Sequence, residues 1–188
     1  IYHAQIVRKG APLKFIIADM PFMSYHVSIE DSLINAGRLM KETGANSIKL
    51  EGGEHFVPVV EKMVKSSIPV CGHLGLTPQS VHKLGGYSVQ GRDKDQRAEI
   101  IKDAKLLEQA GAFALVLEMV PEDLAKEISE TLSIPTIGIG AGRYCDGQVL
   151  VLNDLLGLDE RFNPKFLKKF ADLFTITKDA ISTYDSEV

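Results

Sequence analysis

Four ionisable side chains stand at or just beyond the carboxyl ends of four different short apolar runs. Asp19 ends the run FIIAD, Glu51 ends SIKLE, His73 follows IPVCG, and Glu118 ends FALVLE. In parallel α/β proteins the carboxyl ends of the strands meet along one edge, and the chemistry is usually built there. We therefore expect these four side chains to share a single site.

Lys49 stands two residues before Glu51 in the segment SIKLEGG. Side chains alternate along a strand, so these two project from the same face. A cation and a carboxylate in this arrangement form either part of an active site or a buried structural ion pair, and both interpretations remain open. Gly52 and Gly53 allow a ligand to approach the backbone closely, but they also suit an ordinary strand-to-helix turn.

Asp19 lies where the chain must leave the sheet, because Pro21 cannot continue a strand ladder. An aspartate at such an exit caps the next helix or binds a ligand, and the cap is the commoner role. Asp19 and Glu51 together supply carboxylate oxygens, the protein donors that Mg²⁺ takes alongside substrate and water. The two acids therefore suggest a magnesium site.

Glu118 ends an apolar run, and partial burial there would favour the protonated carboxyl and suit a general base. The alternative is an exposed acid that caps the helix expected after Pro121. His73 in CGHLGLTPQS is a polarising group, a residue that orients a neighbour, or a histidine satisfied within the core. The pattern gives no role to the other histidines, which are His3, His26, His55 and His82.

Two glycine-containing loops suggest further hypotheses. The segment IPTIGIGAGRYCDGQ matches neither the phosphate loop nor the dinucleotide fingerprint, so close packing of this loop is favoured over phosphate binding. The segment GGYSVQGR at 85–92 offers Gly85, Gly86 and Gly91 as hinges, with Tyr87 and Arg92 as ligand contacts. We predict that it is a mobile cover over the site, the alternative being an ordinary surface loop.

Short β-rich apolar runs alternate with segments of helical period, which is typical of βα units around a parallel sheet. We expect strands at 15–19, 47–51, 68–72, 113–118, 134–139 and 148–152, and helices at 28–43, 56–66, 77–84, 93–110, 121–132 and 164–184. A four-residue spacing in the last helix predicts an apolar stripe for packing on the barrel or a neighbouring subunit: Phe162, Phe166, Phe170 and Phe174.

Six such units fit an open doubly wound sheet or most of an eight-unit barrel, and the polar strand ends favour the barrel. There is no linker or internal repeat beyond the βα rhythm, so we expect one domain over residues 1–188. The opening segment IYHAQIVRKGAPLK is typical of a helix end and a connection, so Ile1 is not expected to be the natural start.

The composition narrows the class of protein. The chain of 188 residues is 45% hydrophobic and 24% charged, as in ordinary globular domains. A net charge of -4 with scattered Lys and Arg argues against nucleic acid as a partner. No apolar run approaches the roughly 20 residues that span a bilayer, and Cys71 and Cys145 lack metal-ligand spacing. We expect a cytoplasmic protein with reduced thiols and no membrane partner.

Several strings occur in the order found in one family. ADMPFMSY, IKLEGG, VCGHLGLTPQSVHKLGGYSVQGR, AGAFALVLEMVP and IPTIGIGAGRYCDGQVLVLNDLLG together resemble ketopantoate hydroxymethyltransferase. The resemblance implies a TIM (β/α)8 barrel, of which this chain carries strands 3 to 8 while the two N-terminal βα units are missing. It also implies Mg²⁺, 5,10-methylenetetrahydrofolate as co-substrate, 3-methyl-2-oxobutanoate as substrate, and a homo-oligomer, typically a decamer.

The resemblance assigns roles to the residues singled out above. Asp19 matches a metal ligand that also contacts the oxo acid, Glu51 a metal ligand, Lys49 an oxo-acid ligand, and Glu118 the proton acceptor. His73 matches a histidine at the mouth and is expected to contact substrate. The family's other metal aspartate, in a Gly-Asp-Ser string, has no counterpart in this sequence.

The implied reaction transfers a hydroxymethyl group to the oxo acid to give ketopantoate in pantothenate biosynthesis. Mg²⁺ would stabilise the enolate that forms when Glu118 removes the C3 proton, and the enolate would attack the folate-borne carbon. Two alternatives remain. One is another Mg²⁺-dependent barrel of the phosphoenolpyruvate/pyruvate type that makes or breaks C–C bonds beside a 2-oxo acid. The other is a noncatalytic truncated subunit.

Overall fold

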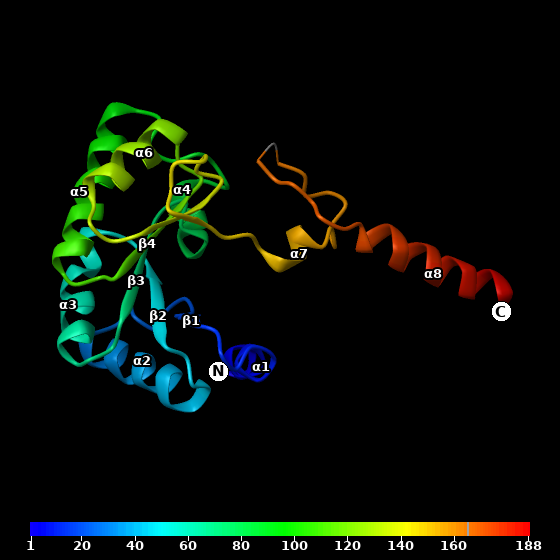
Figure 1. Ribbon diagram of the computed structural model, residues 1–188, viewed down its shortest axis with the longest axis horizontal. Coiled ribbons are helices and arrows are strands. Elements are labelled where there is room, and N and C mark those ends of the chain that lie inside the picture. Colours follow the sequence, from blue (N-terminus) through cyan, green and yellow to red (C-terminus); the bar gives the residue numbers. More distant parts are fainter. Residues whose placement is uncertain (165) are drawn as a thin grey trace. The chain divides into compact units, whose positions relative to one another are not determined.

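A sheet whose strand order follows the chain order organises residues 1–147. In the computed structural model, which describes residues 1–164 and 166–188, β1 to β5 pair in parallel, each strand with the next. The short β6 follows β5 at the edge of the sheet. The strands are β1 (Ile17–Asp19), β2 (Ser47–Glu51), β3 (Val70–Gly75), β4 (Ala114–Glu118), β5 (Thr136–Ile139) and β6 (Gly147–Gln148). The sheet is a curled, incomplete barrel (Figure 1).

The long helices of this unit cover one face of the sheet (Figure 1). Ser28 begins the first of them by accepting a hydrogen bond from the Asp31 N–H, and Asp93 does the same for the Gln96 N–H. Such caps satisfy helix donors that have no partner within the helix. The helices are α1 (Tyr2–Gly10), α2 (Ile29–Thr43), α3 (Val57–Lys65), α4 (Val81–Leu84), α5 (Lys94–Gln109) and α6 (Glu122–Thr131), with 3-10 turns η1 (Glu54–Phe56) and η2 (Pro78–Ser80).

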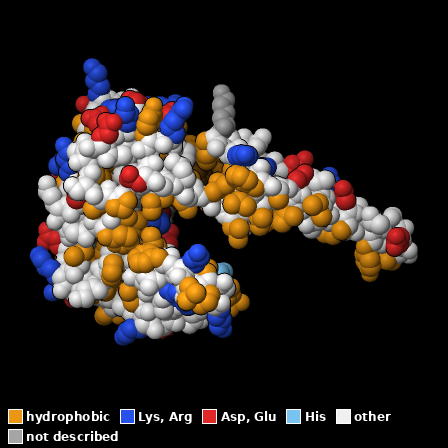
Figure 2. All heavy atoms as spheres, in the orientation of Figure 1, with side chains coloured by type: hydrophobic (Ala, Val, Ile, Leu, Met, Phe, Trp, Pro, Cys, Tyr) orange, Lys and Arg blue, Asp and Glu red, His pale blue; other side chains and the backbone are white. Residues whose placement is uncertain are grey.

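The two faces of the sheet are packed differently. Alternate strand residues such as Ile48, Leu50 and Leu115 face the helices and form the main core, all with no exposed surface. The intervening positions form a small second cluster, which centres on Cys71 and Val116. Figure 2 shows apolar side chains gathered where Figure 1 has the strands. The sheet therefore has one fully covered face and one face on which ionisable side chains such as Lys49 are accommodated.

Residues 148–188 form a second compact unit, with α7 (Leu152–Leu155) and α8 (Leu173–Glu187). Here two predictions are wrong. The run expected as a strand at 148–152 is extended at Val151 but pairs as a strand only at Gln148. A strand needs a hydrogen-bonded neighbour, and apolar composition alone does not provide one. The expectation of one domain over 1–188 stays a prediction.

Residue 165 of the expected helix at 164–184 lies outside the described residues. The helix α8 begins at Leu173, because the Asp172 carboxylate accepts from the Thr175 N–H and caps it there. The preceding chain is held to α7 instead, since the Phe170 N–H donates to the Leu155 carbonyl at 2.8 Å. The prediction of a helical stripe of phenylalanines is therefore wrong. Phe174 is helical, whereas the other three precede α8 and are exposed: Phe162, Phe166 and Phe170.

None of the described helices is both long and apolar enough to cross a bilayer.

The remaining differences between the predicted and the observed elements of the first unit concern their boundaries. The expected strand at 68–72 runs on to Gly75, so His73 lies inside β3 rather than after it. Two expected helices, at 56–66 and 77–84, each open with a 3-10 turn. The helix expected before the first strand is confirmed as α1.

Candidate active site

Each of the five predicted side chains lies close to at least one of the others. Lys49 Nζ is 2.9 Å from Asp19 Oδ1 and 3.3 Å from His73 Nδ1. His73 Nε2 is 3.2 Å from Glu118 Oε2, and His73 Nδ1 is 3.7 Å from Glu51 Oε1. An acid, an ammonium, an imidazole and a second acid thus follow one another across four strands.

Strand register produces this row, which runs from Asp19 through Lys49 and His73 to Glu118. Asp19 pairs with Lys49 between β1 and β2, and Glu51 pairs with His73 between β2 and β3. Glu118 is the last residue of β4. Parallel pairing puts equivalent strand ends side by side, so residues far apart in sequence become neighbours at the carboxyl edge.

His73 is 2% exposed and sits at the centre of the row. An ammonium group only donates hydrogen bonds, so Lys49 donates to Nδ1, and the proton of the neutral ring belongs on Nε2. Nε2 is directed at Glu118 but makes no hydrogen bond of good geometry within the described residues. His73 is therefore a buried donor aimed at the candidate base, with capacity left for a ligand.

Glu51 is 5% exposed, and burial raises the pKa of its carboxyl, while Lys49 and His73 act in the opposite direction. One of its oxygens, Oε2, accepts from the Gln79 N–H at 3.0 Å. Burial likewise raises the pKa of the neighbouring Tyr25 to about 12, which keeps that hydroxyl protonated. Sequence reasoning missed Tyr25 and Gln79, although both stand in the strings ADMPFMSY and GHLGLTPQ.

The fit to Mg²⁺ rests on the donor chemistry of two carboxylates. Asp19 and Glu51 supply hard oxygen donors, and Mg²⁺ uses one or two protein carboxylates with substrate and water. Among residues 1–164 and 166–188, no three His, Cys, Asp or Glu side chains are grouped closely enough to hold an ion by themselves. The two acids therefore fit Mg²⁺, which takes its remaining ligands from substrate and water.

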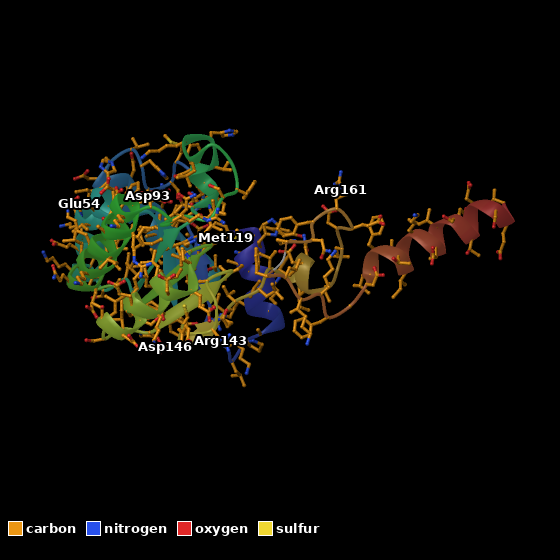
Figure 3. The ribbon with its side chains drawn as sticks, turned by 90° about the horizontal axis from the view of Figure 1, so that it is seen from above. Glu54, Asp93, Met119, Arg143, Asp146 and Arg161 are labelled. Carbon is orange, nitrogen blue, oxygen red and sulfur yellow. The ribbon has the colours of Figure 1, made fainter. Side chains whose placement is uncertain are left out.

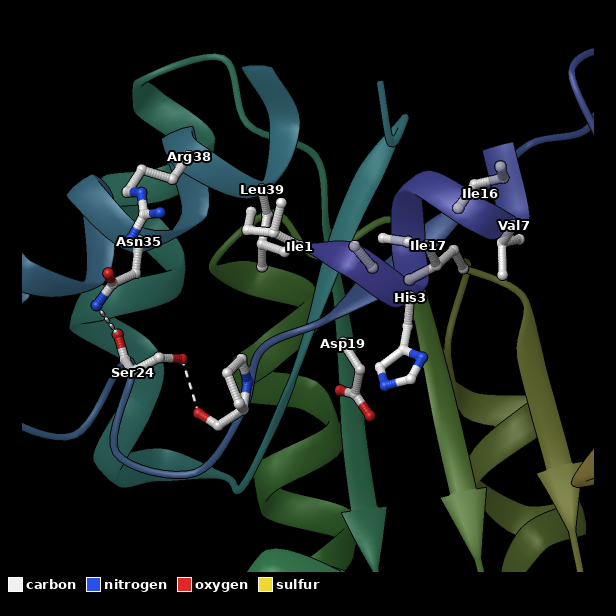
Figure 4. A pocket seen from close by; sticks show the side chains of 13 residues that line it. Ile1, His3, Val7, Ile16, Ile17, Asp19, Ser24, Asn35, Arg38 and Leu39 are labelled. Atoms are coloured by element: carbon white, nitrogen blue, oxygen red, sulfur yellow. Dashed lines mark hydrogen bonds between the residues drawn. The ribbon is translucent and has the colours of Figure 1, made fainter. Parts of the chain in front are cut away.

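A pocket of about 430 Å³ opens beside β1 and exposes Asp19. Figure 4 shows the side chains of Asp19 and His3 pointing into it. The Asp19 side chain is 52% exposed, whereas that of Lys49 is only 18% exposed. Asp19 is therefore the exposed end of the row in this chain, and Lys49 lies directly behind it.

Gly75 lets the ends of β3 and β4 approach each other. The Leu76 N–H donates to the Glu118 carbonyl at 2.8 Å, and a Cβ on Gly75 would collide with that same carbonyl oxygen. Gly75 also has φ +90, a conformation that L side chains rarely adopt. This close approach fixes the backbone that carries the candidate base.

We expect Gly75→Ala to lower the free energy of unfolding by about 2–4 kcal/mol, since backbone strain and overlap act together. Gly85→Ala is the matched control, because Gly85 also has a positive φ, +73, but has no atoms within 4 Å of a Cβ. The control should lose only about 1 kcal/mol. Urea denaturation of the chain measures both, and equal losses would show that crowding at Glu118 is unimportant.

The segment at 85–92 is held at its second half. Gln90 is buried, its N–H donates to the Met119 carbonyl at 2.8 Å, and its side chain is bonded to Gln96 and Ser88. Tyr87, in contrast, is largely exposed. The mobile cover stays a prediction, and Gln90 is fixed in place by these hydrogen bonds.

The glycine-rich loop after β5 is fastened on both sides. Asp146 Oδ2 accepts from the N–H and hydroxyl of Thr136, and Arg143 pairs with Glu122 at 3.0 Å. Figure 3 labels Arg143 and Asp146 at neighbouring places in the first unit. These contacts are consistent with close packing of the loop, which was favoured over phosphate binding.

A curled parallel sheet with ionisable residues at its carboxyl edge defines a barrel-type α/β protein. Solved structures share this fold. Orotidine 5'-monophosphate decarboxylase from Methanocaldococcus jannaschii aligns with a TM-score of 0.56 at 19% identity, covering 81% of this chain and 69% of that one. A phosphonopyruvate hydrolase aligns with a TM-score of 0.50 at 13% identity, covering 73% and 50%.

Sequence relatives define the family within that class. The family model for ketopantoate hydroxymethyltransferase matches residues 1–188. The 3-methyl-2-oxobutanoate hydroxymethyltransferase of Pseudothermotoga lettingae is 57% identical over 188 residues, which is 100% of this chain and 71% of that protein. That of Thermoanaerobacter sp. strain X514 is 56% identical and is covered to 69%. The chain belongs to the ketopantoate hydroxymethyltransferase family, transferases of pantothenate biosynthesis.

Proposed function

We propose that this chain, within a protein of its relatives' length, transfers a hydroxymethyl group from 5,10-methylenetetrahydrofolate to 3-methyl-2-oxobutanoate. Family membership supports the reaction. The observation that carries the assignment to particular residues is the continuous row from Asp19 through Lys49 and His73 to Glu118. It places a cation and a carboxylate on either side of a buried imidazole.

Each residue of the row has a task in this proposal. The Lys49 ammonium binds an oxygen of the oxo acid, and the Glu118 carboxylate takes the proton from C3. His73 donates from Nε2 and orients Glu118 or a substrate oxygen. Side-chain exposure of 19% lets Glu118 meet substrate while most water is kept away.

Asp19 and Glu51 are the residues that would hold Mg²⁺. When bound, the ion supplies Lewis acidity that makes the C3 hydrogen of a chelated oxo acid easier to remove. The protein side chains then bind, orient and accept the proton. The upstream aspartate that the family resemblance implies would add a further ligand.

The bonds and atoms balance with one water consumed. The C3–H bond breaks and its proton passes to Glu118, while C3 forms a bond to the methylene carbon of the folate. The bonds from that carbon to the folate nitrogens break, and tetrahydrofolate leaves with its nitrogens protonated. The water oxygen becomes the new hydroxyl, so the products are ketopantoate and tetrahydrofolate.

The proposal extends to the assembly and its setting. We propose a single (β/α)8 barrel domain completed by two further N-terminal βα units, in a cytoplasmic homo-oligomer that is a decamer as in the resemblance. Apolar side chains exposed on α8, among them Ile176 and Ile181, support contacts between subunits. No nucleic acid or membrane partner is part of this proposal.

Folate dependence tests the reaction. A protein of the relatives' length is incubated with 3-methyl-2-oxobutanoate and Mg²⁺, with or without 5,10-methylenetetrahydrofolate, and ketopantoate is measured by mass spectrometry. We expect the product only with folate. Folate-independent consumption of the oxo acid would favour a C–C lyase or mutase, whose barrel fold phosphonopyruvate hydrolase shares. Turnover by the protein of the relatives' length but none by the 188-residue chain would favour a noncatalytic truncated subunit.

A further inference from the structure

Tyr25 is buried in the loop between β1 and α2 and has none of the roles above. Its hydroxyl accepts from the Glu51 N–H at 3.2 Å and donates to Gln79 Oε1 at 2.9 Å. Its ring meets that of Phe56 edge to face, with centroids 5.1 Å apart. The tyrosine is therefore fixed at both its ring and its hydroxyl, directly behind the end of β2.

Gln79 lies in η2 and contacts Glu51 from the other side. Its backbone N–H donates to Glu51 Oε2 at 3.0 Å, while its side-chain Nε2 donates to the Met20 carbonyl at 2.9 Å. One residue thus touches the Glu51 carboxylate and ties the loop after β3 to the loop after β1. Together with Tyr25 it closes a hydrogen-bonded ring around Glu51.

This ring determines which way Glu51 faces. Its Oε2 is occupied by Gln79, so Oε1 is the oxygen turned toward His73, at 3.7 Å from Nδ1. A carboxylate with one oxygen held by a backbone N–H loses much of its rotational freedom. The free oxygen is presented toward the row of site residues.

We infer that Tyr25 and Gln79 are positioning residues that hold the Glu51 carboxylate in its ligand-binding orientation, an inference that rests on the proposed function for the role of Glu51. Within the described part of the chain, the bonds of the Tyr25 hydroxyl and the Gln79 side chain go to Glu51, Met20 and each other, not to the row. They act through Glu51, as partners of a metal ligand generally do. A purely structural role would instead join the two loops without affecting what Glu51 binds.

The orientation is tested first without metal, in the 188-residue chain. Tyr25→Phe keeps the ring but removes the hydroxyl between Glu51 and Gln79. Amide hydrogen exchange, followed by NMR, should become about tenfold faster at Gln79, because local opening releases its N–H. The Leu107 amide of α5 should be unaffected. An unchanged Gln79 amide, or one that accelerates only in step with Leu107, overturns the inference.

Metal binding is tested next in the protein of full family length, with Mn²⁺ as a paramagnetic probe. Tyr25→Phe and Gln79→Ala should each weaken Mn²⁺ binding about tenfold, the effect expected of a residue behind a metal ligand. Gln79→Ala keeps the backbone N–H that donates to Glu51 Oε2, but it removes the side-chain bonds to Tyr25 and Met20 that hold this N–H in place. The double variant should be no weaker than the worse single variant by more than about twofold, because both residues act through one carboxylate. Tyr184→Phe is the control, since its hydroxyl is on an exposed residue of α8.

Glu51→Gln distinguishes failure of the inference from failure of the proposed function. If Glu51→Gln weakens Mn²⁺ binding while Tyr25→Phe and Gln79→Ala do not, positioning is overturned and the metal role of Glu51 stands. If Glu51→Gln has no effect on Mn²⁺ binding, the metal role of Glu51 in the proposed function is wrong. The inference that Tyr25 and Gln79 hold Glu51 in a ligand-binding orientation then fails as well. Loss of binding in all three, with control behaviour in Tyr184→Phe, supports both.

Discussion

Glu118→Gln will reduce the exchange of the C3 hydrogen of 3-methyl-2-oxobutanoate with solvent deuterium by about 10²–10⁴-fold, the contribution of a positioned general base. An amide has nearly the same shape as the carboxylate but cannot accept the proton. Binding of the oxo acid should change little, because Lys49 and its partners are intact. NMR of the oxo acid in D₂O, with the full-length protein and Mg²⁺, measures this step without folate.

Glu122→Gln is the matched control for this prediction. Glu122 lies four residues further on, in the first turn of α6, and pairs with Arg143 rather than with the row. Glu122→Gln makes the same chemical change, and with this variant the C3 hydrogen of the oxo acid should exchange at the wild-type rate. Wild-type exchange in Glu118→Gln itself would place the base elsewhere, and would leave His73 as the first residue to examine.

Lys49→Met will raise the KM for the oxo acid by about 10–100-fold, as expected when a charge-assisted hydrogen bond worth about 1.5–3 kcal/mol is lost. Methionine keeps the length and apolar stem of lysine while removing the ammonium. The variant also removes the donor to His73 Nδ1 and the partner of Asp19. We therefore expect kcat to fall as well, since the imidazole is no longer held in one tautomer.

Initial rates at varied concentrations of the oxo acid measure this effect. Lys126→Met is the control, because the ion pair that Lys126 forms in the described chain is with Glu130, on the surface of α6. A structural ion pair makes a different prediction. In that case Lys49→Met lowers the free energy of unfolding, whereas KM per folded molecule stays the same. Urea denaturation of both variants separates the two interpretations.

Local patterns were sufficient for most of the secondary structure of the first unit. The strand expected at 47–51 has those bounds, and the helices expected from Ser28 and Asp93 begin with caps at those residues. Alternation within a strand and capping of a helix involve only neighbouring residues, so the sequence alone determines them. The same reasoning selected the row from Asp19 to Glu118: Asp19, His73 and Glu118 end or follow an apolar run, and Lys49 shares a strand face with Glu51.

Contacts between distant segments decided the rest. His73 lies within β3 because pairing with β2 and β4 extends that strand, and pairing partners are not encoded beside the residue itself. The helix α8 begins after a cap at Asp172, whereas the four-residue spacing of the phenylalanines had predicted an earlier start. Tyr25 and Gln79 are 54 residues apart and meet at Glu51 through hydroxyl and main-chain hydrogen bonds. Only the folded backbone brings those groups together, and no periodic pattern of side chains records where a main-chain N–H will point.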